Sequence, residues 1–180
     1  MSTVSDLLAA FDDRADAWLE QLRGNKVADI VFPAASELGD FSLIWQLVNA
    51  GRGTMSDSQA DASLLFAGLL GLESLVVNQG VKRLFHRGRP TVAGDPRYPV
   101  RRPSTSSFPS GHASSAFFAA AILTTAAGRA MAPVWYTLAV VVALSRVYVR
   151  IHHASDVVAG AAVGALLGQG ALRILRGLRH

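Results

Sequence analysis

Long apolar segments separated by polar turns constrain most strongly how this chain of 180 residues can fold. Four such segments cover residues 59–81, 112–127, 134–149 and 155–175, and polar residues interrupt a fifth over residues 27–50. A helix needs about 20 predominantly apolar residues to cross a bilayer. Only 17% of the residues are charged, whereas soluble domains carry about 25%. We therefore expect an all-α integral membrane protein, a bundle of about five transmembrane helices.

An additional, amphipathic helix is predicted near the N-terminus, over residues 5–23. Its apolar stripe is formed by Leu8, Phe11, Ala15, Trp18 and Leu22, and its acidic face by Asp12, Asp13, Asp16 and Glu20. We expect residues 1–26 to lie in the membrane interface, and residues 27–180 to form the transmembrane domain. Interfacial helices usually have basic polar faces, so packing against the protein or a dimer contact is an equally good alternative.

The formal net charge of +4 and the sequence pI near 10.1 could suggest a nucleic-acid partner. However, the basic residues flank the apolar segments and form no continuous stripe with interleaved aromatic side chains. No nucleic-acid partner is therefore expected, and the lipid bilayer is the partner that the composition predicts. The chain has no cysteine, which excludes disulfides, thiolate metal ligands and cysteine nucleophiles.

Small residues form a ridge along the last apolar segment, at Gly160, Gly164 and Gly168. Such a ridge allows another helix to approach closely. We expect the partner helix to belong to the same bundle, and a homo-oligomer remains the alternative.

A polar loop over residues 83–110 follows the second apolar segment, and its prolines, Pro90, Pro96, Pro99, Pro103 and Pro109, rule out a membrane span there. If five segments cross the membrane, the second ends, the third begins, the fourth ends and the fifth begins on the same side. The topology therefore brings residues 82–89, 110–112 and 146–156 to one membrane face.

These converging residues suit a phosphoryl group. Lys82, Arg89 and Arg146 are fixed cations, and arginine can grip two phosphate oxygens at once. Ser110 and Gly111 stand at the start of a predicted helix, where free N–H groups and the helix dipole attract anions. The charge that spreads over the phosphoryl oxygens in the transition state would be stabilised by this set.

Two histidines complete the set. His152 and Asp156 are four residues apart, so they would share one face of a helix that began there, and the carboxylate could hold one ring nitrogen as N–H. The other ring nitrogen would then be free to attack phosphorus. His112 has no neighbouring carboxylate in the sequence and suits the role of general acid and base. With cations doing the work of a metal, neither a metal nor any other cofactor is expected.

Three motifs occur in order: Lys82, six residues and Arg89-Pro90; Pro109-Ser110-Gly111-His112; and Ser145-Arg146, five residues, His152, three residues and Asp156. Together they resemble the signature of the type 2 phosphatidic acid phosphatase superfamily, over about residues 27–175. The resemblance implies a helical membrane bundle that removes phosphate from a lipid phosphate or diphosphate through a phosphohistidine. His153 and Ala154 stand where members often have an aromatic residue and a proline, which could alter loop shape or substrate fit.

Other polar residues of these loops have simpler interpretations. Arg83 and Arg87 are expected to anchor a span end in the lipid headgroups. A second phosphate or acidic headgroups could be bound by Arg97, Arg101 and Arg102. Arg150 and His153 are interpreted as peripheral to the site.

Two other functions fit part of the pattern. A vanadium-dependent haloperoxidase could use the same oxyanion pocket, although those relatives are soluble. A non-enzymatic, anion-binding membrane protein would not need both histidines.

The candidate substrates are polyprenyl diphosphates such as undecaprenyl diphosphate, phosphatidic acid, phosphatidylglycerol phosphate and, as an alternative, polyprenyl-linked sugar phosphates of cell-wall synthesis. The protein is expected in the cell membrane as a multi-pass protein. The positive-inside rule favours a cytoplasmic catalytic face. Because the family acts mostly on the outer face, the resemblance favours an extracytoplasmic one.

Overall fold

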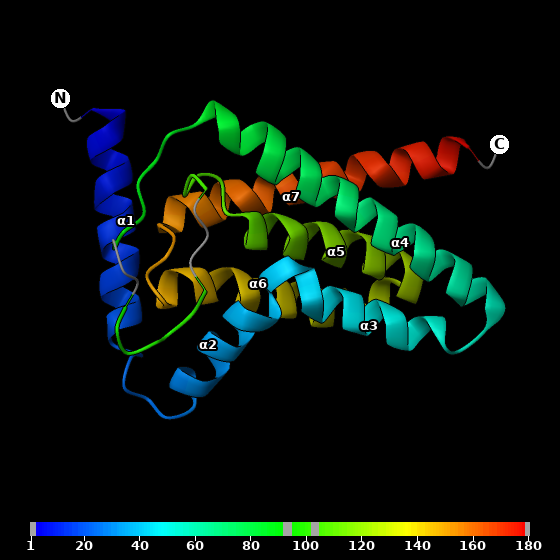
Figure 1. Ribbon diagram of the computed structural model, residues 1–180, viewed down its shortest axis with the longest axis horizontal. Helices are drawn as coiled ribbons and strands as arrows, with labels where there is room; N and C mark the ends of the chain where they lie inside the picture. Colours follow the sequence, from blue (N-terminus) through cyan, green and yellow to red (C-terminus); the bar gives the residue numbers. More distant parts are fainter. Residues whose placement is uncertain (1–2, 92–94, 102–104, 179–180) are drawn as a thin grey trace.

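The computed structural model describes residues 3–91, 95–101 and 105–178, and every regular element among them is helical. The helices are α1 (Val4–Glu20), α2 (Ala28–Leu38), α3 (Leu43–Gly53), α4 (Asp57–Leu75), α5 (Gly111–Ala127), α6 (Ala132–Tyr148) and α7 (Ala154–Gly177). Short helical turns are η1 (Asp40–Ser42), η2 (Val76–Gly80), η3 (Val81–Leu84) and η4 (Arg129–Met131). Helices α4 to α7 run along the long axis, and α1 lies across the end where α4 and α6 finish and α5 and α7 begin (Figure 1). The prediction of an all-α bundle is confirmed.

Among the residues that the structure describes, three helices are long and apolar enough to cross a membrane, namely Asp57–Leu84, Arg129–Tyr148 and Ala154–Gly177. They include the segments predicted over residues 59–81, 134–149 and 155–175. Helix α5 is shorter, and most of its side chains are buried because alanines at close spacing let α6 and α7 pack tightly around it. A total of five crossings remains a prediction.

The interrupted segment over residues 27–50 folds as two helices. Helix α2 ends at Leu38, and α3 begins at Leu43 after the turn η1. Phe41 and Ser42 adopt left-handed backbone conformations there, with φ of 52° and 59°, which breaks the continuity of the helix. The side chain of Trp45, fully buried, then anchors α3 in the same apolar core as α5. The break places Asp40 at the end of the bundle where the predicted motifs meet.

The predicted glycine ridge packs inside the bundle, against α5. A Cβ atom at Gly164 would lie 1.9 Å from the carbonyl oxygen of Ser114, and one at Gly160 would lie 2.3 Å from that of Ser110. Only glycine allows the two backbones to come this close. At the end of this contact, the Ser110 N–H donates to the Asp156 carbonyl over 2.9 Å, which aligns the starts of α5 and α7.

Helix α1 turns its acidic face toward the protein. Asp12 is buried, and Leu19 beside it packs in the core, whereas Leu8, Phe11 and Trp18 on the apolar stripe are about half exposed. The predicted helix is present, and its acidic face is explained by arginines of the loops that it covers. The exposed apolar side chains remain available to a membrane interface.

Candidate active site

A cavity of about 450 Å³ opens between the turn η1 and the end of α4. Its walls include Lys82, Gly111, His112 and His152, which come from all three predicted motifs. The topology that the sequence predicted has therefore brought these motifs together at one end of the bundle (Figure 1).

Two of the predicted cations are almost completely buried. Lys82 in η3 is 5% exposed, and Arg146 near the end of α6 is 1% exposed. Nη1 of Arg146 donates to the carbonyl and to the hydroxyl of Ser36 in α2. Its Nε and Nη2 atoms, equally buried, have no hydrogen-bond partner among the residues that the structure describes. Buried N–H groups of a cation are costly to leave unpaired. The Nε and Nη2 atoms of Arg146 can therefore donate hydrogen bonds to a bound anion.

The third predicted cation, Arg89, lies against the imidazole of His152. Its Nη1 atom donates to the Ile151 carbonyl over 2.7 Å and lies 3.2 Å from Nε2 of His152. Its Nη2 atom donates to the Thr105 carbonyl over 3.0 Å. These bonds fix the guanidinium of Arg89 beside Nε2 of His152, the ring nitrogen that we expect to attack phosphorus.

The start of α5 provides free N–H groups beside the histidines. The hydroxyl of Ser110 caps the helix by accepting from Ala113 N–H over 3.4 Å. The backbone N–H of Ser110 is already bonded to Asp156, whereas those of Gly111 and His112 bond to no other described residue. The helix terminus can thus offer two backbone donors to an anion, and Ser110 only its hydroxyl.

His152 and Asp156 meet, but not on one face of a helix. Helix α7 begins at Ala154, so His152 lies in the preceding turn, where its N–H donates to the Arg146 carbonyl. Asp156 is the third residue of α7, and its carboxylate folds back to accept the N–H of His153 over 2.9 Å. This brings its Oδ2 atom to 3.5 Å from Nδ1 of His152. The expected shared helix face is therefore corrected to a contact across a helix start.

Burial keeps His152 neutral. Its side chain is 1% exposed, and this desolvation lowers the pKa of His152 to about 3, against the opposing effect of Asp156. The neighbouring cations, with Arg146 the strongest of them, lower this pKa further. A neutral imidazole with one nitrogen directed to a carboxylate is the form that can act as a nucleophile.

Two polar side chains that the sequence did not assign to the site hold Asp156. Arg87, interpreted as a membrane anchor, donates through Nη1 to Oδ1 of Asp156 over 2.6 Å. The hydroxyl of Ser107 donates to Oδ2 and lies 3.4 Å from Nδ1 of His152. Arg87 stands two residues before Arg89, and Ser107 stands three residues before Ser110. This closeness to the motifs was the only sequence feature that could have assigned the two residues to the site.

His112 also has a carboxylate partner, which the sequence did not reveal. Its Nε2 atom lies 3.0 Å from Oδ1 of Asp40 and 3.2 Å from the Ser36 carbonyl. Asp40 was interpreted only as an interruption of an apolar segment. An acidic residue inside such a segment is itself a signal of function.

The remaining loop arginines separate into two groups. Arg97 pairs with Asp95 and with Glu20 of α1, and Arg150 pairs with Asp16 of α1, so both bind the N-terminal helix. Arg101 lines the cavity, and Arg102 lies outside the described residues. Within the described part of the chain, no group of three or more histidine and acidic side chains is arranged to hold a metal ion.

Comparisons with known proteins agree with this architecture. The model of the PAP2 superfamily matches residues 62–179. A curated relative, the decaprenylphosphoryl-5-phosphoribose phosphatase of Mycobacterium tuberculosis, is 33% identical over 136 residues, which are 74% of this chain and 72% of the relative.

Two crystal structures share the fold. The transmembrane PAP2 type phosphatidylglycerolphosphate phosphatase of Bacillus subtilis has a TM-score of 0.70 and 23% identity, over 99% of this chain and 87% of that one. LpxE of Aquifex aeolicus has a TM-score of 0.66 and 18% identity, over 96% of both chains. By the family match and the curated relative, the chain belongs to the PAP2 superfamily and is a phosphatase.

Proposed function

We propose that this phosphatase hydrolyses the phosphate of a membrane lipid through a phosphohistidine at His152. The Nε and Nη2 atoms of the buried Arg146, which have no hydrogen-bond partner among the described residues, carry the proposal, because a phosphoryl group placed beside them would satisfy both. Lys82, which lines the cavity between η1 and the end of α4, adds a second cation. Arg89, at the edge of the His152 ring, adds the third.

In the first step, Nε2 of His152 attacks phosphorus while Nδ1 keeps its proton toward Asp156. An N–P bond forms, the bond from phosphorus to the lipid oxygen breaks, and His112 protonates that oxygen as it leaves. The N–H groups of Gly111 and His112, together with the three cations, stabilise the charge on the phosphoryl oxygens.

In the second step, His112 removes a proton from water, which attacks phosphorus and releases inorganic phosphate from His152. Asp40 supports both proton transfers. The Ser36 carbonyl, 3.2 Å from Nε2 of His112, accepts the proton on that nitrogen, and the Asp40 carboxylate, 3.0 Å from the same atom, stabilises positive charge on the ring. Nδ1 is then left to exchange protons with the leaving oxygen and with water.

We place the protein in the cell membrane with five crossings and the cavity at the extracytoplasmic face. Exposed leucines along α4, such as Leu64, Leu72 and Leu75, suit contact with lipid chains. The apolar side chains of α1 would then lie in the interface at the end of the bundle that carries the cavity (Figure 1).

A phosphate on a polyprenyl-linked sugar is the substrate class that the curated relative favours, since that protein is named for such a compound. The polar rim of the cavity, where Asp40, Asn78 and Gln79 stand, offers partners for sugar hydroxyls. Polyprenyl diphosphates, phosphatidic acid and phosphatidylglycerol phosphate are the other candidates, and they lack this array of hydroxyls or present fewer.

The test is phosphate release from a panel of these four lipids, measured with the purified protein in detergent, with and without a chelator. We expect the wild-type protein to release phosphate from at least one lipid at a rate that the chelator does not lower. His152→Ala should release no phosphate. Turnover by His152→Ala at the wild-type rate would contradict the mechanism. Bromide oxidation on addition of vanadate, without lipid turnover, would instead support the haloperoxidase alternative.

A further inference from the structure

We infer that Asp12 of α1 is a positioning residue for the nucleophile, acting through Arg87 and Asp156, so that the N-terminal helix is part of the catalytic apparatus. This inference rests on the proposed function of His152. Helix α1 lies outside residues 62–179, the part of the chain that the family model matches. The role of Asp12 is therefore carried by the contacts of this structure.

Arg87 links the two carboxylates with one guanidinium. Its Nη2 atom donates to Oδ2 of Asp12 over 2.7 Å, and its Nη1 atom donates to Oδ1 of Asp156 over 2.6 Å. Asp12 is 6% exposed and Asp156 is fully buried. An arginine shared in this way has its position set by both partners, because its planar fork cannot serve them from another orientation.

Asp12 also holds the first turn of α7 directly. Its Oδ1 atom accepts the N–H of Ser155 over 2.7 Å, and its Oδ2 atom accepts the Ser155 hydroxyl over 2.8 Å. A carboxylate at a helix N-terminus satisfies unpaired N–H groups and interacts favourably with the helix dipole. Asp156 follows Ser155, so both routes from Asp12 lead to the carboxylate that faces His152.

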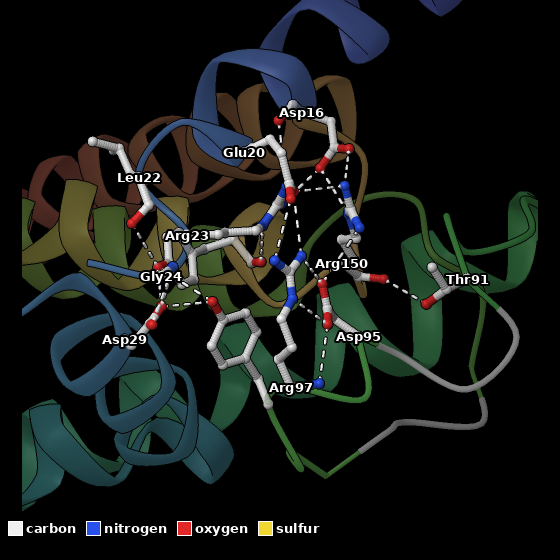
Figure 2. Close-up of polar contacts among 12 residues, drawn as sticks. Asp16, Glu20, Leu22, Arg23, Gly24, Asp29, Thr91, Asp95, Arg97 and Arg150 are labelled. Atoms are coloured by element: carbon white, nitrogen blue, oxygen red, sulfur yellow. Dashed lines mark hydrogen bonds and ion pairs between the residues drawn. The ribbon is translucent and has the colours of Figure 1, made fainter. Parts of the chain in front are cut away.

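Further ion pairs fix α1 against the turn that carries His152 (Figure 2). Arg150 stands two residues before His152 with a left-handed backbone, φ 55°, and its Nη2 atom lies 2.9 Å from carboxylate oxygens of both Asp16 and Glu20. Arg23 donates through Nε to the Tyr148 carbonyl over 2.9 Å and pairs with Asp16. These contacts hold α1 in place and thereby hold Asp12 over Arg87.

The order of charges explains why Asp12 should affect chemistry. Asp12, Arg87 and Asp156 alternate in sign, and the next group, His152, gains positive charge as it forms a phosphohistidine. Without the carboxylate of Asp12, Arg87 would interact with Asp156 alone and neutralise it more completely. Asp156 would then hold the imidazole less firmly, while the phosphate contacts of Lys82 and Arg146 would be unchanged.

The experiment compares Asp12→Asn with Asp13→Asn, a neighbouring exposed carboxylate that makes no hydrogen bond or ion pair with another described residue. Phosphate release from a lipid phosphate that the wild type hydrolyses is measured over a range of concentrations. We expect Asp12→Asn to lower kcat by about 10-fold to 100-fold with an unchanged KM, the range that loss of an outer hydrogen-bond partner of a ligand histidine produces at metal sites. Asp13→Asn should behave as the wild type. Wild-type kcat for Asp12→Asn would overturn the inference.

A double-mutant cycle separates positioning from a general effect on the fold. In an Asp156→Asn background, adding Asp12→Asn should lower kcat no further, because Asp12 acts only through Asp156. Equal losses of kcat in both backgrounds would overturn the inference. If Asp12→Asn fails to fold, Arg87→Lys takes its place in the same cycle, since lysine keeps the charge but cannot bridge both carboxylates. His152→Ala distinguishes the two proposals, because its activity bears on the proposed function alone.

Discussion

At the scale of single residues, the candidate site contains two histidines that each face a carboxylate. Asp156 could be predicted from the sequence because it stands four residues after His152. Asp40 could not be predicted, because it lies in the turn η1 between α2 and α3. It is distant from His112 in the sequence and meets it only in the folded bundle. Arg87 was misinterpreted for a similar reason, since nothing in the sequence shows that α1 approaches it.

The role of Asp40 predicts a dependence on the leaving group. Asp40→Asn should lower kcat for a lipid phosphate by about 10-fold, because His112 would donate its proton less well. The loss should be much smaller with p-nitrophenyl phosphate, whose leaving group needs no proton. Glu37→Gln, at an exposed position one turn earlier, is the control. An equal loss with both substrates would exclude Asp40 as the partner of the acid.

The low pKa of His152, about 3 because of its burial, predicts a neutral imidazole throughout the physiological range. In the free enzyme, its ring nitrogens should show no titration between about pH 5 and pH 8, where an exposed histidine titrates near 6.5. NMR of protein labelled with ¹⁵N-histidine in detergent, with His152→Ala to assign the signal, provides the measurement. A midpoint near 6.5 would show that the ring is accessible to solvent.

At the scale of secondary-structure elements, the apolar segments after residue 58 were predicted well because their composition alone indicates helices. Their ends were marked by local signals, such as the Ser110 cap of α5 and Gly128 after it. The break between α2 and α3 was visible only as polar interruptions, since the left-handed conformations of Phe41 and Ser42 depend on packing around them. The tilt of α1 across the bundle had no signal in the sequence.

The close contact of α5 and α7 predicts that Gly164 cannot be replaced. Gly164→Ala would place a methyl group 1.9 Å from the Ser114 carbonyl oxygen, and we expect a destabilisation of about 1–3 kcal/mol from the forced separation. Gly170→Ala is the matched control on the same helix, because its Cβ would meet no atom within 4 Å. Thermal unfolding in detergent should show a lower Tm for the first variant only. Equal Tm values would contradict the packing described.

The ion pairs that hold α1 predict a loss of stability in acid. The hydrogen bonds from Arg97 lower the pKa of Asp95 to about 2. A carboxyl group with a lower pKa in the folded state stabilises the fold above its unfolded pKa of about 4, and this contribution disappears as the pH falls toward 2. Asp95→Asn should therefore unfold with less dependence on pH between 4 and 2 than the wild type. An identical dependence would show that this pair contributes nothing to the fold.

At the scale of the whole molecule, the long helices bring three distant motifs to one end of a bundle, and α1 closes over that end (Figure 1). The convergence of the motifs could be predicted, because the order of the apolar segments places alternate loops on the same side. The covering by α1 could not be predicted, because its acidic side chains pair with arginines of three different loops, namely Arg23, Arg87 and Arg150.

The proposed mechanism requires His152 to carry the phosphoryl group between lipid and water. It is tested most directly by mixing the protein with a ³²P-labelled lipid phosphate and quenching in alkali, where phosphohistidine survives. We expect label on the wild-type protein at a peptide containing His152, and no label on His152→Ala. Lipid turnover without any labelled protein, or label on His152→Ala, would contradict it.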